Sequence, residues 1–385
     1  MSHIVAYSAS SNLSIDTKVE GILSAIGGMS NYVKPGNIVL IKPNFVAPFP
    51  HATTSLEVLG AIITAVKHCG GKPVIAESAG YEFDTEVTFK LLGAYDFARK
   101  IGVKLINLDK AKYIHARLTR GFVREVKVPK LVLEADVLIN VPKLKRHSLT
   151  SATISMKNLV GFLHRESRCK IHCVGLEQAI FELSKLIHSH LVIVDGTVIT
   201  GRAVFGSQHH LSLLVGSDNT YAADVFCCRI LGVNPRDIKH IRHSLNEGLV
   251  GEMSKTIPIG TEEPLGDVLK VILPESNLKK NCLLHIAYRL MYSVELLYTR
   301  IMNARSLIPA AHYYFGIRPW IDRGICDRCG ICLDVCPVDA IKIQDKEIDA
   351  SLCMKVRCMQ CLSVCPHRAI RIRGRKMHDA SIQLD

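Results

Sequence analysis

The feature that most constrains this chain of 385 residues is a cysteine-rich segment, 326–365, which holds eight of its fourteen cysteines. The segment opens with the spacing C-x2-C-x2-C-x3-C-P, and the last three cysteines of that run recur 29 positions later, again followed by proline. The segment therefore contains two copies of one small unit. The repeated cysteines are Cys329, Cys332 and Cys336 in the first copy and Cys358, Cys361 and Cys365 in the second.

This spacing is typical of bacterial-type ferredoxins, in which cysteine thiolates hold 4Fe–4S clusters. The closely spaced cysteines of one run bind one cluster, and the cysteine before proline binds the other. We therefore expect two 4Fe–4S clusters. Zinc also binds paired C-x2-C motifs, but two four-cysteine runs that each end in Cys-Pro favour iron–sulfur clusters. The expected ligands are Cys326, Cys329, Cys332 and Cys365 for cluster I, and Cys353, Cys358, Cys361 and Cys336 for cluster II.

The second copy departs from the pattern at its first cysteine. The repeat would place a cysteine at position 355, where Lys355 stands, and the nearest cysteine is Cys353. The resulting spacing is C-x4-C, and we expect a small bulge that lets Cys353 bind cluster II. The alternative is a cluster II with three cysteine ligands and a labile or missing iron, which could bind a substrate directly.

The start of the chain contains no basic stretch followed by a long apolar run, so we expect no signal peptide. No uncharged apolar run reaches the roughly 18 residues of a membrane span. Without an export signal, fourteen cysteines indicate metal or redox chemistry and not a disulfide framework. Because clusters of this type are often sensitive to oxygen, we expect a cytoplasmic and anaerobic setting.

Residues 1–275 alternate short apolar runs with helical stretches, a pattern typical of an α/β domain with a layered, mostly parallel sheet. We expect a helical linker over 276–320, a small α+β two-cluster ferredoxin domain over 321–376 and a tail over 377–385. Residues 113–128 alternate around an Arg-Gly pair and predict an inserted hairpin. The expected strands are 4–7, 38–41, 73–76, 103–107, 137–141, 191–194 and 211–215, and the clearest expected helices are 55–68, 176–188 and 220–231.

Within the linker, residues 279–306 carry apolar side chains at helical spacing, interrupted by arginine and glutamate. We expect this helix to pack on the large domain. A helix that lies on a membrane surface also combines an apolar face with basic residues, so peripheral membrane contact is the less favoured alternative.

Polar side chains follow four of the expected strands, at the point where each strand ends. In an open α/β sheet, ligands bind beyond the carboxyl ends of the strands, so these side chains are expected to converge. The sequence has no G-x-G-x-x-G or G-x-x-x-x-G-K-[ST] motif, which disfavours a standard nicotinamide, flavin or ATP site. The residues at these strand ends are Lys42, Asn44, Glu77, Lys143, Lys145, His147 and Asp195.

The motifs IKPN, ESAG, NVPKLKRHSLT, MKNLVG, VDG and DNTYAAD resemble the uncharacterised iron–sulfur protein family numbered 362 among the domains of unknown function. The resemblance covers residues 1–275 and implies an α/β domain that is often fused to a two-cluster ferredoxin domain; it implies no particular reaction. Arg146 and Ala79 stand where this family leads us to expect threonine and proline. The candidate site residues that the motifs mark are Lys42, Asn44, Glu77, Lys143, Lys145, His147, Lys157, Asn158, Asp195, Asp218 and Asp224.

The distribution of charge bears on partners. The net charge is +13, and residues 99–146 hold 13 Lys and Arg against 4 Asp and Glu, which predicts a small anionic substrate. The basic stretch 368–376 would suit an acidic, ferredoxin-type electron donor. Nucleic acid is disfavoured, because no nucleic-acid-binding module is recognisable and aromatic residues make up only 6% of the chain.

These features favour an iron–sulfur oxidoreductase, a ferredoxin-linked reductase in which two 4Fe–4S clusters pass low-potential electrons to a small anionic substrate or cofactor in the α/β domain. His147, Glu77 and Lys143 are the catalytic candidates, since reduction of an organic substrate usually requires a proton donor. The alternative is an electron-transfer or docking subunit that delivers electrons to a separate partner enzyme. An ATP-coupled activator is weakened by the missing nucleotide loop. The residues expected to bind the substrate are Lys42, Asn44, Lys145, Lys157, Asn158, Asp195, Asp218 and Asp224.

Overall fold

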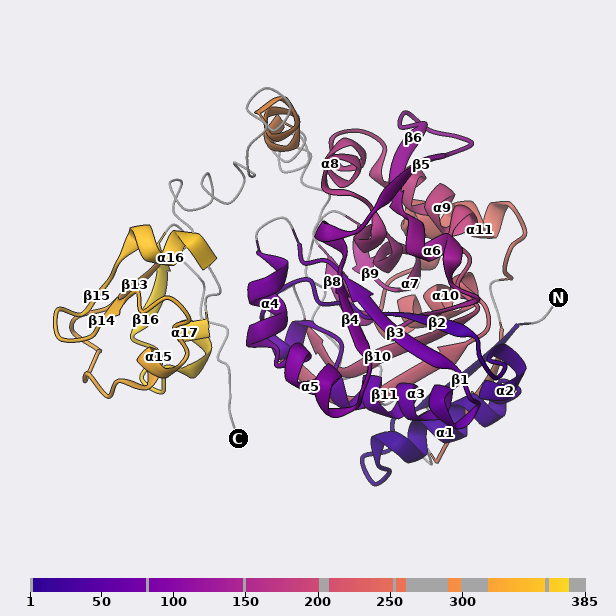
Figure 1. Ribbon diagram of the computed structural model, residues 1–385, viewed down its shortest axis with the longest axis horizontal. Coiled ribbons are helices and arrows are strands. Elements are labelled where there is room, and N and C mark those ends of the chain that lie inside the picture. Colours follow the sequence, from indigo (N-terminus) through magenta and orange to yellow (C-terminus); the bar gives the residue numbers. More distant parts are fainter. Residues whose placement is uncertain are drawn as a thin grey trace.

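The computed structural model describes residues 3–80, 83–147, 150–200, 208–251, 254–260, 290–298, 318–356 and 360–373. Figure 1 shows a large α/β domain and a small cysteine-bearing domain beside it. The expected fold class, a mostly parallel sheet covered by helices and followed by a small second domain, is confirmed.

A single sheet forms the centre of the large domain, and the described residues contribute ten strands to it. All seven strands expected from the sequence belong to it, with boundaries that differ most at β10 and β11, which are longer than expected. The strands are β1 (Ile4–Ser8), β2 (Ile38–Lys42), β3 (Lys72–Glu77), β4 (Lys104–Asn107), β7 (Val137–Asn140), β8 (Lys143–His147), β9 (Ser151–Thr153), β10 (Leu191–Thr200), β11 (Gln208–Ser217) and β12 (Lys255–Pro258).

The strands lie in the order β12-β1-β11-β10-β7-β2-β3-β4, and β8 pairs with β10 and β9. The strands from β10 to β4 run parallel to one another, whereas β11 is antiparallel to both of its neighbours. The chain moves outward from β2 to β3 and β4, and then returns to place β7 on the other side of β2. The direction of progress therefore reverses between β2 and β7, and open α/β sheets bind their ligands at such a switch point.

Helices cover both faces of this sheet (Figure 1). Successive strand residues point to opposite faces, so Val39 and Ile41 belong to one apolar core and Leu40 to the other. α1 and α3 pack on the first core, and α9 and α10 pack on the second. The helices of this domain are α1 (Ile15–Ala25), α2 (Met29–Tyr32), α3 (Leu56–His68), α4 (Thr85–Leu91), α5 (Ala94–Lys100), α6 (Lys130–Glu134), α7 (Ser155–Asn158), α8 (Arg165–Cys173), α9 (Leu176–Leu186), α10 (Thr220–Ile230) and α11 (Lys239–Asn246).

Local sequence signals fix where several of these elements begin. The side chain of Ser55 accepts a backbone N–H at the start of α3, and Asn219 does the same for α10. Such caps satisfy N–H groups that have no partner inside the helix. The expected hairpin is also present, because β5 (Tyr113–Arg117) and β6 (Glu125–Pro129) pair antiparallel.

The small domain consists of two interlocked units that follow the 29-residue cysteine repeat. β13 pairs with β16 from the other unit, and β14 pairs with β15 in the same exchanged manner. The second unit also contains α16 (Ala350–Val356), in the stretch where the cysteine spacing departs from the repeat. The matching elements are β13 (Arg318–Ile321), α15 (Ile331–Asp334) and β14 (Ile341–Lys342) in the first unit, and β15 (Glu347–Ile348), α17 (Gln360–Val364) and β16 (Ile370–Arg373) in the second.

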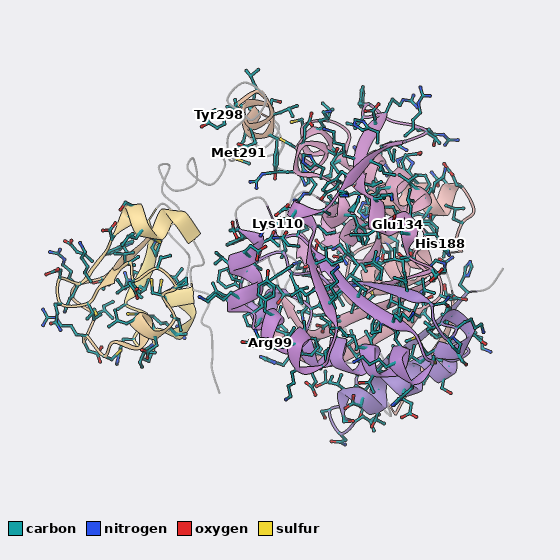
Figure 2. The ribbon with its side chains drawn as sticks, in the orientation of Figure 1. Arg99, Lys110, Glu134, His188, Met291 and Tyr298 are labelled. Carbon is teal, nitrogen blue, oxygen red and sulfur yellow. The ribbon has the colours of Figure 1, made fainter. Side chains whose placement is uncertain are left out.

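Residues 290–298 are helical and pack on α8, where Tyr292 is buried with Cys169 and Cys173. Figure 2 shows Met291 and Tyr298 on this helix. This part of the expected 279–306 helix therefore packs on the large domain; the remainder, like the 377–385 tail, lies outside the described residues. In the described part of the chain, no helix combines the length and apolar character that a membrane crossing needs.

Candidate functional site

Beside the switch point of the sheet, Lys42 forms an ion pair with Glu77 inside the protein. These residues end β2 and β3, and the Lys42 Nζ atom lies 2.5 Å from the Glu77 Oε2 atom. Neither side chain is more than 2% exposed. The carboxylate also accepts the backbone N–H groups of Phe45 and Ser78. Glu77 is thus held by three partners within the chain and links the ends of two strands.

Gly161 encloses this ion pair. A Cβ atom at position 161 would lie 2.7 Å from Lys42 Nζ and 2.8 Å from Glu77 Oε1, so a side chain there would collide with both charged groups. The ring of Phe162 lies 5.3 Å from Lys42 Nζ, and the carbonyl of Gly161 accepts a hydrogen bond from Ser78. The pair is therefore covered by backbone and an aromatic ring instead of water.

Lys143 forms a second buried ion pair, with Asp195. The Lys143 Nζ atom lies 3.0 Å from Asp195 Oδ2, because β8 and β10 pair these two residues in register. Asp195 also accepts the backbone N–H groups of Ser55, at the start of α3, and of Thr197. The charge of Lys143 is already balanced, and the pair joins β8, β10 and α3.

Lys145 differs from these two lysines because its hydrogen-bond partners are neutral. Its Nζ atom donates to the side-chain oxygen of Asn44 and to the carbonyl of Ala52, both at 2.9 Å. Asn44 donates in turn to Asn158 at 2.9 Å, and Asn158 donates to Asn140 at 2.8 Å. All four side chains are buried. They form one chain of hydrogen bonds that begins at the Lys145 ammonium group.

Lys157 is the second buried lysine of this site with a neutral partner, since its Nζ atom donates to Thr150 Oγ1 at 2.9 Å. Within the described residues, neither Lys157 nor Lys145 has a carboxylate within 4.0 Å. Burial holds the pKa of His147 well below its usual value, and the charge of Lys157 is the next largest cause of this lowering. We call Lys145, Lys157 and His147 the basic cluster.

Burial also controls the protonation of the two lysines. Loss of hydration lowers the pKa of Lys145 to about 7, and the charge of Lys143 contributes to the lowering. Burial likewise holds the pKa of Lys157 well below its usual value, although Glu177 opposes this shift. An amine with a pKa near neutrality can both attract an anion and donate a proton to it.

Asp224 supports this region through α7. The fully buried carboxylate on α10 accepts the backbone N–H groups of Ser155 and Met156, at 2.8 and 3.1 Å, where α7 begins. α7 carries Lys157 and Asn158. Asp224 therefore positions two site candidates and forms no ion pair with the lysines.

Asp218 lies apart from the other candidates. It follows β11, whose last residue, Ser217, pairs with Val192 near the start of β10. Asp218 is exposed at the amino edge of the parallel strands, opposite the edge that carries Lys42 and Asp195. We expected Asp218 to join the site, but the structure places it away from the other candidates. Because β11 runs antiparallel to β10, its carboxyl end lies at the opposite edge of the sheet.

Asn140 accepts a hydrogen bond from Asn158, and Thr150 accepts one from Lys157. Neither Asn140 nor Thr150 is among the site residues predicted from the sequence. Asn140 is the last residue of β7 and pairs in register with Lys42 across the switch point. A polar residue that ends an apolar strand was the available signal for it. Thr150 is the last residue of the motif NVPKLKRHSLT and lies between β8 and β9, so that motif was the available signal for it.

The small domain brings four of the expected ligands to one pocket. Burial raises the pKa of the Cys332 thiol, and the charges of the other three thiols contribute to the rise. Four neighbouring thiols with an apolar wall fit a 4Fe–4S cluster, whose irons favour thiolate ligands. The pocket is lined by Cys326, Cys329, Cys332 and Cys365, the set expected for cluster I, together with Ile321, Ile343, Ile370, Ala369, Asp327 and His367.

The two Cys-Pro cysteines have matching surroundings. The Cys336 sulfur accepts the backbone N–H of Ala340 at 3.2 Å, and the Cys365 sulfur accepts that of Ala369 at 3.3 Å. Hydrogen bonds to sulfur adjust the reduction potential of an iron–sulfur cluster. Both units therefore present their last cysteine in the same way.

The structure describes only some of the cysteines that are expected to bind cluster II. Cys361 is buried in the core of the small domain, Cys336 lies at its edge, and α16 carries Cys353. Cys358 lies outside the described residues. Ligation of cluster II by Cys353 stays a prediction.

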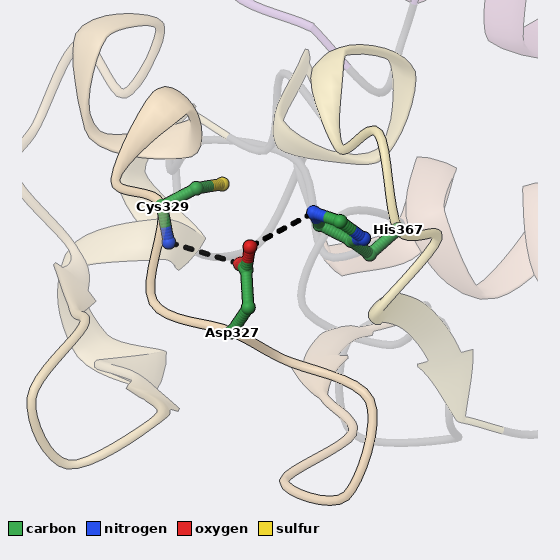
Figure 3. A group of neighbouring side chains, drawn as sticks. All are labelled: Asp327, Cys329 and His367. Carbon is green, nitrogen blue, oxygen red and sulfur yellow. Dashed lines mark hydrogen bonds and ion pairs between the residues drawn. The ribbon is translucent and has the colours of Figure 1, made fainter.

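Asp327 and His367 form a polar rim on the cysteine pocket. The His367 Nε2 atom lies 2.9 Å from Asp327 Oδ2, and Asp327 accepts the backbone N–H of Cys329 (Figure 3). The three side chains are exposed, and their potential ligand atoms lie within 4.8 Å of one another. We assign this group to the wall of the cluster pocket, because Cys329 is an expected cluster ligand.

Two family models match the chain. The model described as Domain of unknown function (DUF362) matches residues 39–229, and the model of a 4Fe-4S dicluster domain matches residues 325–369. The first range contains all eleven site candidates of the large domain, and the second contains all eight expected ligand cysteines.

Comparison with individual proteins gives two further similarities. The chain is 28% identical over 228 residues to the thylakoid-associated protein sll1697 of Synechocystis sp., which covers 56% of this chain and 70% of that protein. Among solved structures, it is similar to the lactate racemase apoprotein from Thermoanaerobacterium thermosaccharolyticum, with a TM-score of 0.41 and 15% sequence identity over 59% of this chain. That similarity spans 56% of the racemase chain, a little more than half its length.

Proposed function

Residues 39–229 match the DUF362 family and residues 325–369 match a 4Fe-4S dicluster domain, and on that premise we propose an iron–sulfur oxidoreductase that reduces a small anion held by Lys145 and Lys157. The dicluster domain supports electron transfer. The observation that supports the anion is the presence of two buried lysines with neutral hydrogen-bond partners beside the switch point of the sheet. Bound 4Fe–4S clusters would supply single electrons at low potential.

The four lysines divide into two roles under this proposal. Lys42 and Lys143 are balanced by carboxylates and hold the strand ends in place. Lys145 and Lys157 have no such partner among the residues that the structure describes, and an unbalanced buried charge is unfavourable. An anionic ligand that contacts both would offset that penalty through charge-assisted hydrogen bonds.

Proton delivery is assigned to Lys145 and not to His147, because the lowered pKa of His147 leaves its ring without a proton to deliver near neutral pH. Lys145 has a pKa of about 7 and can therefore release its proton near neutral pH. Glu77, which the sequence favoured for this role, has its carboxylate engaged by Lys42 and two backbone N–H groups. We therefore propose structural roles for Glu77 and Lys143 and reserve chemistry for the basic cluster.

The experiment is reoxidation of the reduced protein by small anions. Anaerobic protein is reduced with stoichiometric dithionite and mixed with a panel of carboxylates and phosphate esters, and the visible absorbance of the clusters is followed. At least one anion should reoxidise the wild type, and Lys145→Met should abolish that reaction while iron and sulfide contents stay unchanged. If no anion reacts, or if the variant reacts at the wild-type rate, the proposal is wrong.

A separate electron-transfer partner is the second candidate, because apolar side chains are exposed beside the cluster I ligands. Ile325, Ile331 and Leu333 are 40%, 43% and 38% exposed, and they adjoin Cys326 and Cys332 in the sequence. An electron donor or a client enzyme would cover such residues on binding. Purification of the intact chain from its own lysate, followed by mass spectrometry, tests for a stoichiometric redox partner.

The location of the protein is also a proposal. Cytoplasmic, anaerobic residence follows from the cluster chemistry, whereas the name of the cyanobacterial relative refers to association with thylakoids. Fractionation of cells under nitrogen, with antibody detection of this chain, distinguishes a soluble pool from a membrane-bound one.

A further inference from the structure

Leu362 of α17 belongs to two apolar clusters at once. It packs with the core of the small domain, beside Cys361 and Cys365. It also packs against a cluster in the large domain, so it bridges the two. Figure 1 shows α17 on the side of the small domain that is turned toward α4 of the large one. We call the large-domain cluster the docking platform; it consists of Ala47, Phe49, Ala52, Ala79 and Phe83.

The internal repeat supplies a comparison for this contact. Leu333 is the equivalent of Leu362 in the first unit, because each directly follows the third cysteine of its triplet run. Leu333 is 38% exposed and belongs to neither apolar cluster. The two units carry the same residue at the same place, but only the second unit uses it to contact the docking platform.

The docking platform is joined to the basic cluster through its backbone. The Ala52 carbonyl accepts the hydrogen bond from Lys145, so one residue contributes to both. Phe49 and Phe83 pack edge to face with their ring centroids 6.0 Å apart, which holds the two loops of the platform together. A group that covers this platform therefore lies next to the residues that we propose to bind the anion.

We infer that Leu362 is a positioning residue that docks the second unit of the small domain on the large domain, so that the Cys361 side of the ferredoxin faces the basic cluster. The consequence for electron delivery rests on the proposed function, but the docking itself does not. Under this inference the first unit, with its exposed Leu333, stays open to an electron donor.

Hydrogen–deuterium exchange of the full chain, loaded with iron and sulfide and kept anaerobic, tests the docking. Leu362→Asp places a charge on an apolar contact, so amides in 45–53 and 79–85 should exchange several-fold faster than in the wild type. Leu333→Asp makes the same chemical change at the equivalent exposed position and should leave those amides unchanged. Leu362→Ala is the milder variant for use if the aspartate disturbs cluster assembly, and it should give a smaller increase of the same kind.

Unchanged exchange in both Leu362 variants, or an equal increase in Leu333→Asp, would overturn the inference. Iron content and visible absorbance provide the check that both variants keep their clusters. The reoxidation assay separates this inference from the proposed function. If Lys145→Met blocks reoxidation but Leu362→Asp changes no exchange, only the docking is wrong; if the exchange changes but no anion reacts, only the proposed function is wrong.

Discussion

The Nζ atom of Lys42 lies 2.5 Å from the Oε2 atom of Glu77, with both side chains removed from water. This ion pair joins the ends of the parallel strands β2 and β3, beside the point where the strand order reverses. Four buried lysines lie near this end of the sheet: Lys42 and Lys143 are balanced by carboxylates. We propose that the other two, Lys145 and Lys157, bind another anion. Because the four lysines have different partners, we expect substitutions and changes of pH at these sites to have different effects.

Loss of the Glu77 charge should destabilise the large domain strongly. Glu77→Gln leaves Lys42 buried without its counter-ion, and removal of one partner of a buried pair typically lowers the free energy of unfolding by about 3–5 kcal/mol. Denaturant unfolding followed by circular dichroism measures this change. Asp96→Asn is the control, because its ion pair with Arg99 is exposed and should contribute less than about 1 kcal/mol.

Substitution of Gly161 should also destabilise the fold, for steric reasons. In Gly161→Ala the new Cβ atom would meet Lys42 Nζ and Glu77 Oε1 at under 3 Å, and overpacking of this kind typically costs about 1–3 kcal/mol. Gly60→Ala in α3 is the matched control, since its Cβ atom would meet only Phe97 at 3.7 Å. That control should gain up to about 1 kcal/mol from helix propensity. Equal unfolding midpoints for the two variants would contradict the enclosed ion pair.

Asp224 should make stability fall as the pH rises. Burial raises its pKa from 3.8 to about 6, although its hydrogen bonds with Ser155 oppose the shift. The folded state then holds a proton that the unfolded state has lost, so the contribution is present below about pH 4 and disappears as the pH passes about 6, a total of roughly 3 kcal/mol. Asp224→Asn should remove this slope even if it lowers stability throughout. Unfolding measured at several pH values from about 5 to about 7 checks it, and parallel slopes for both proteins would contradict the assignment.

Anion binding should weaken at alkaline pH because Lys145 loses its proton. With a pKa of about 7, the affinity for an anion that requires the ammonium form should fall by up to about tenfold for each pH unit above that value. Lys145→Arg keeps its charge over this range and should show a flatter dependence. The rate of reoxidation by the reactive anion, measured at limiting concentration, reports the difference. A wild-type profile as flat as that of the arginine variant would exclude Lys145 as the titrating group.

Much of the fold could be predicted from the sequence because its signals are local. The apolar runs at 38–41 and 137–141 were recognisable as buried strands, and the cysteine repeat indicated two related units in the small domain. β8 was harder to predict, because Lys143 and Lys145 alternate with apolar Leu144 in a segment that is basic overall. Such a segment resembles a loop until the burial of its lysines is known.

The site could be predicted as a group of residues but not as a set of pairs. Lys42, Glu77 and Asp195 were identified from their positions at strand ends, yet nothing in the sequence showed which lysine faces which carboxylate. Those pairings depend on strand order and register, which are long-range properties. The same reason explains Asp218, whose strand looked like its neighbours but runs in the opposite direction.

Native mass spectrometry of the chain purified without oxygen tests the central claim, that the small domain binds two 4Fe–4S clusters. The expected mass is that of the chain plus two complete 4Fe–4S cores, and Cys353→Ser should lose iron from one of them. A complex that lacks one iron in the wild type would point to three cysteine ligands at cluster II. Zinc-sized increments without sulfide would contradict the account, because a zinc-bound small domain could not transfer electrons to the basic cluster.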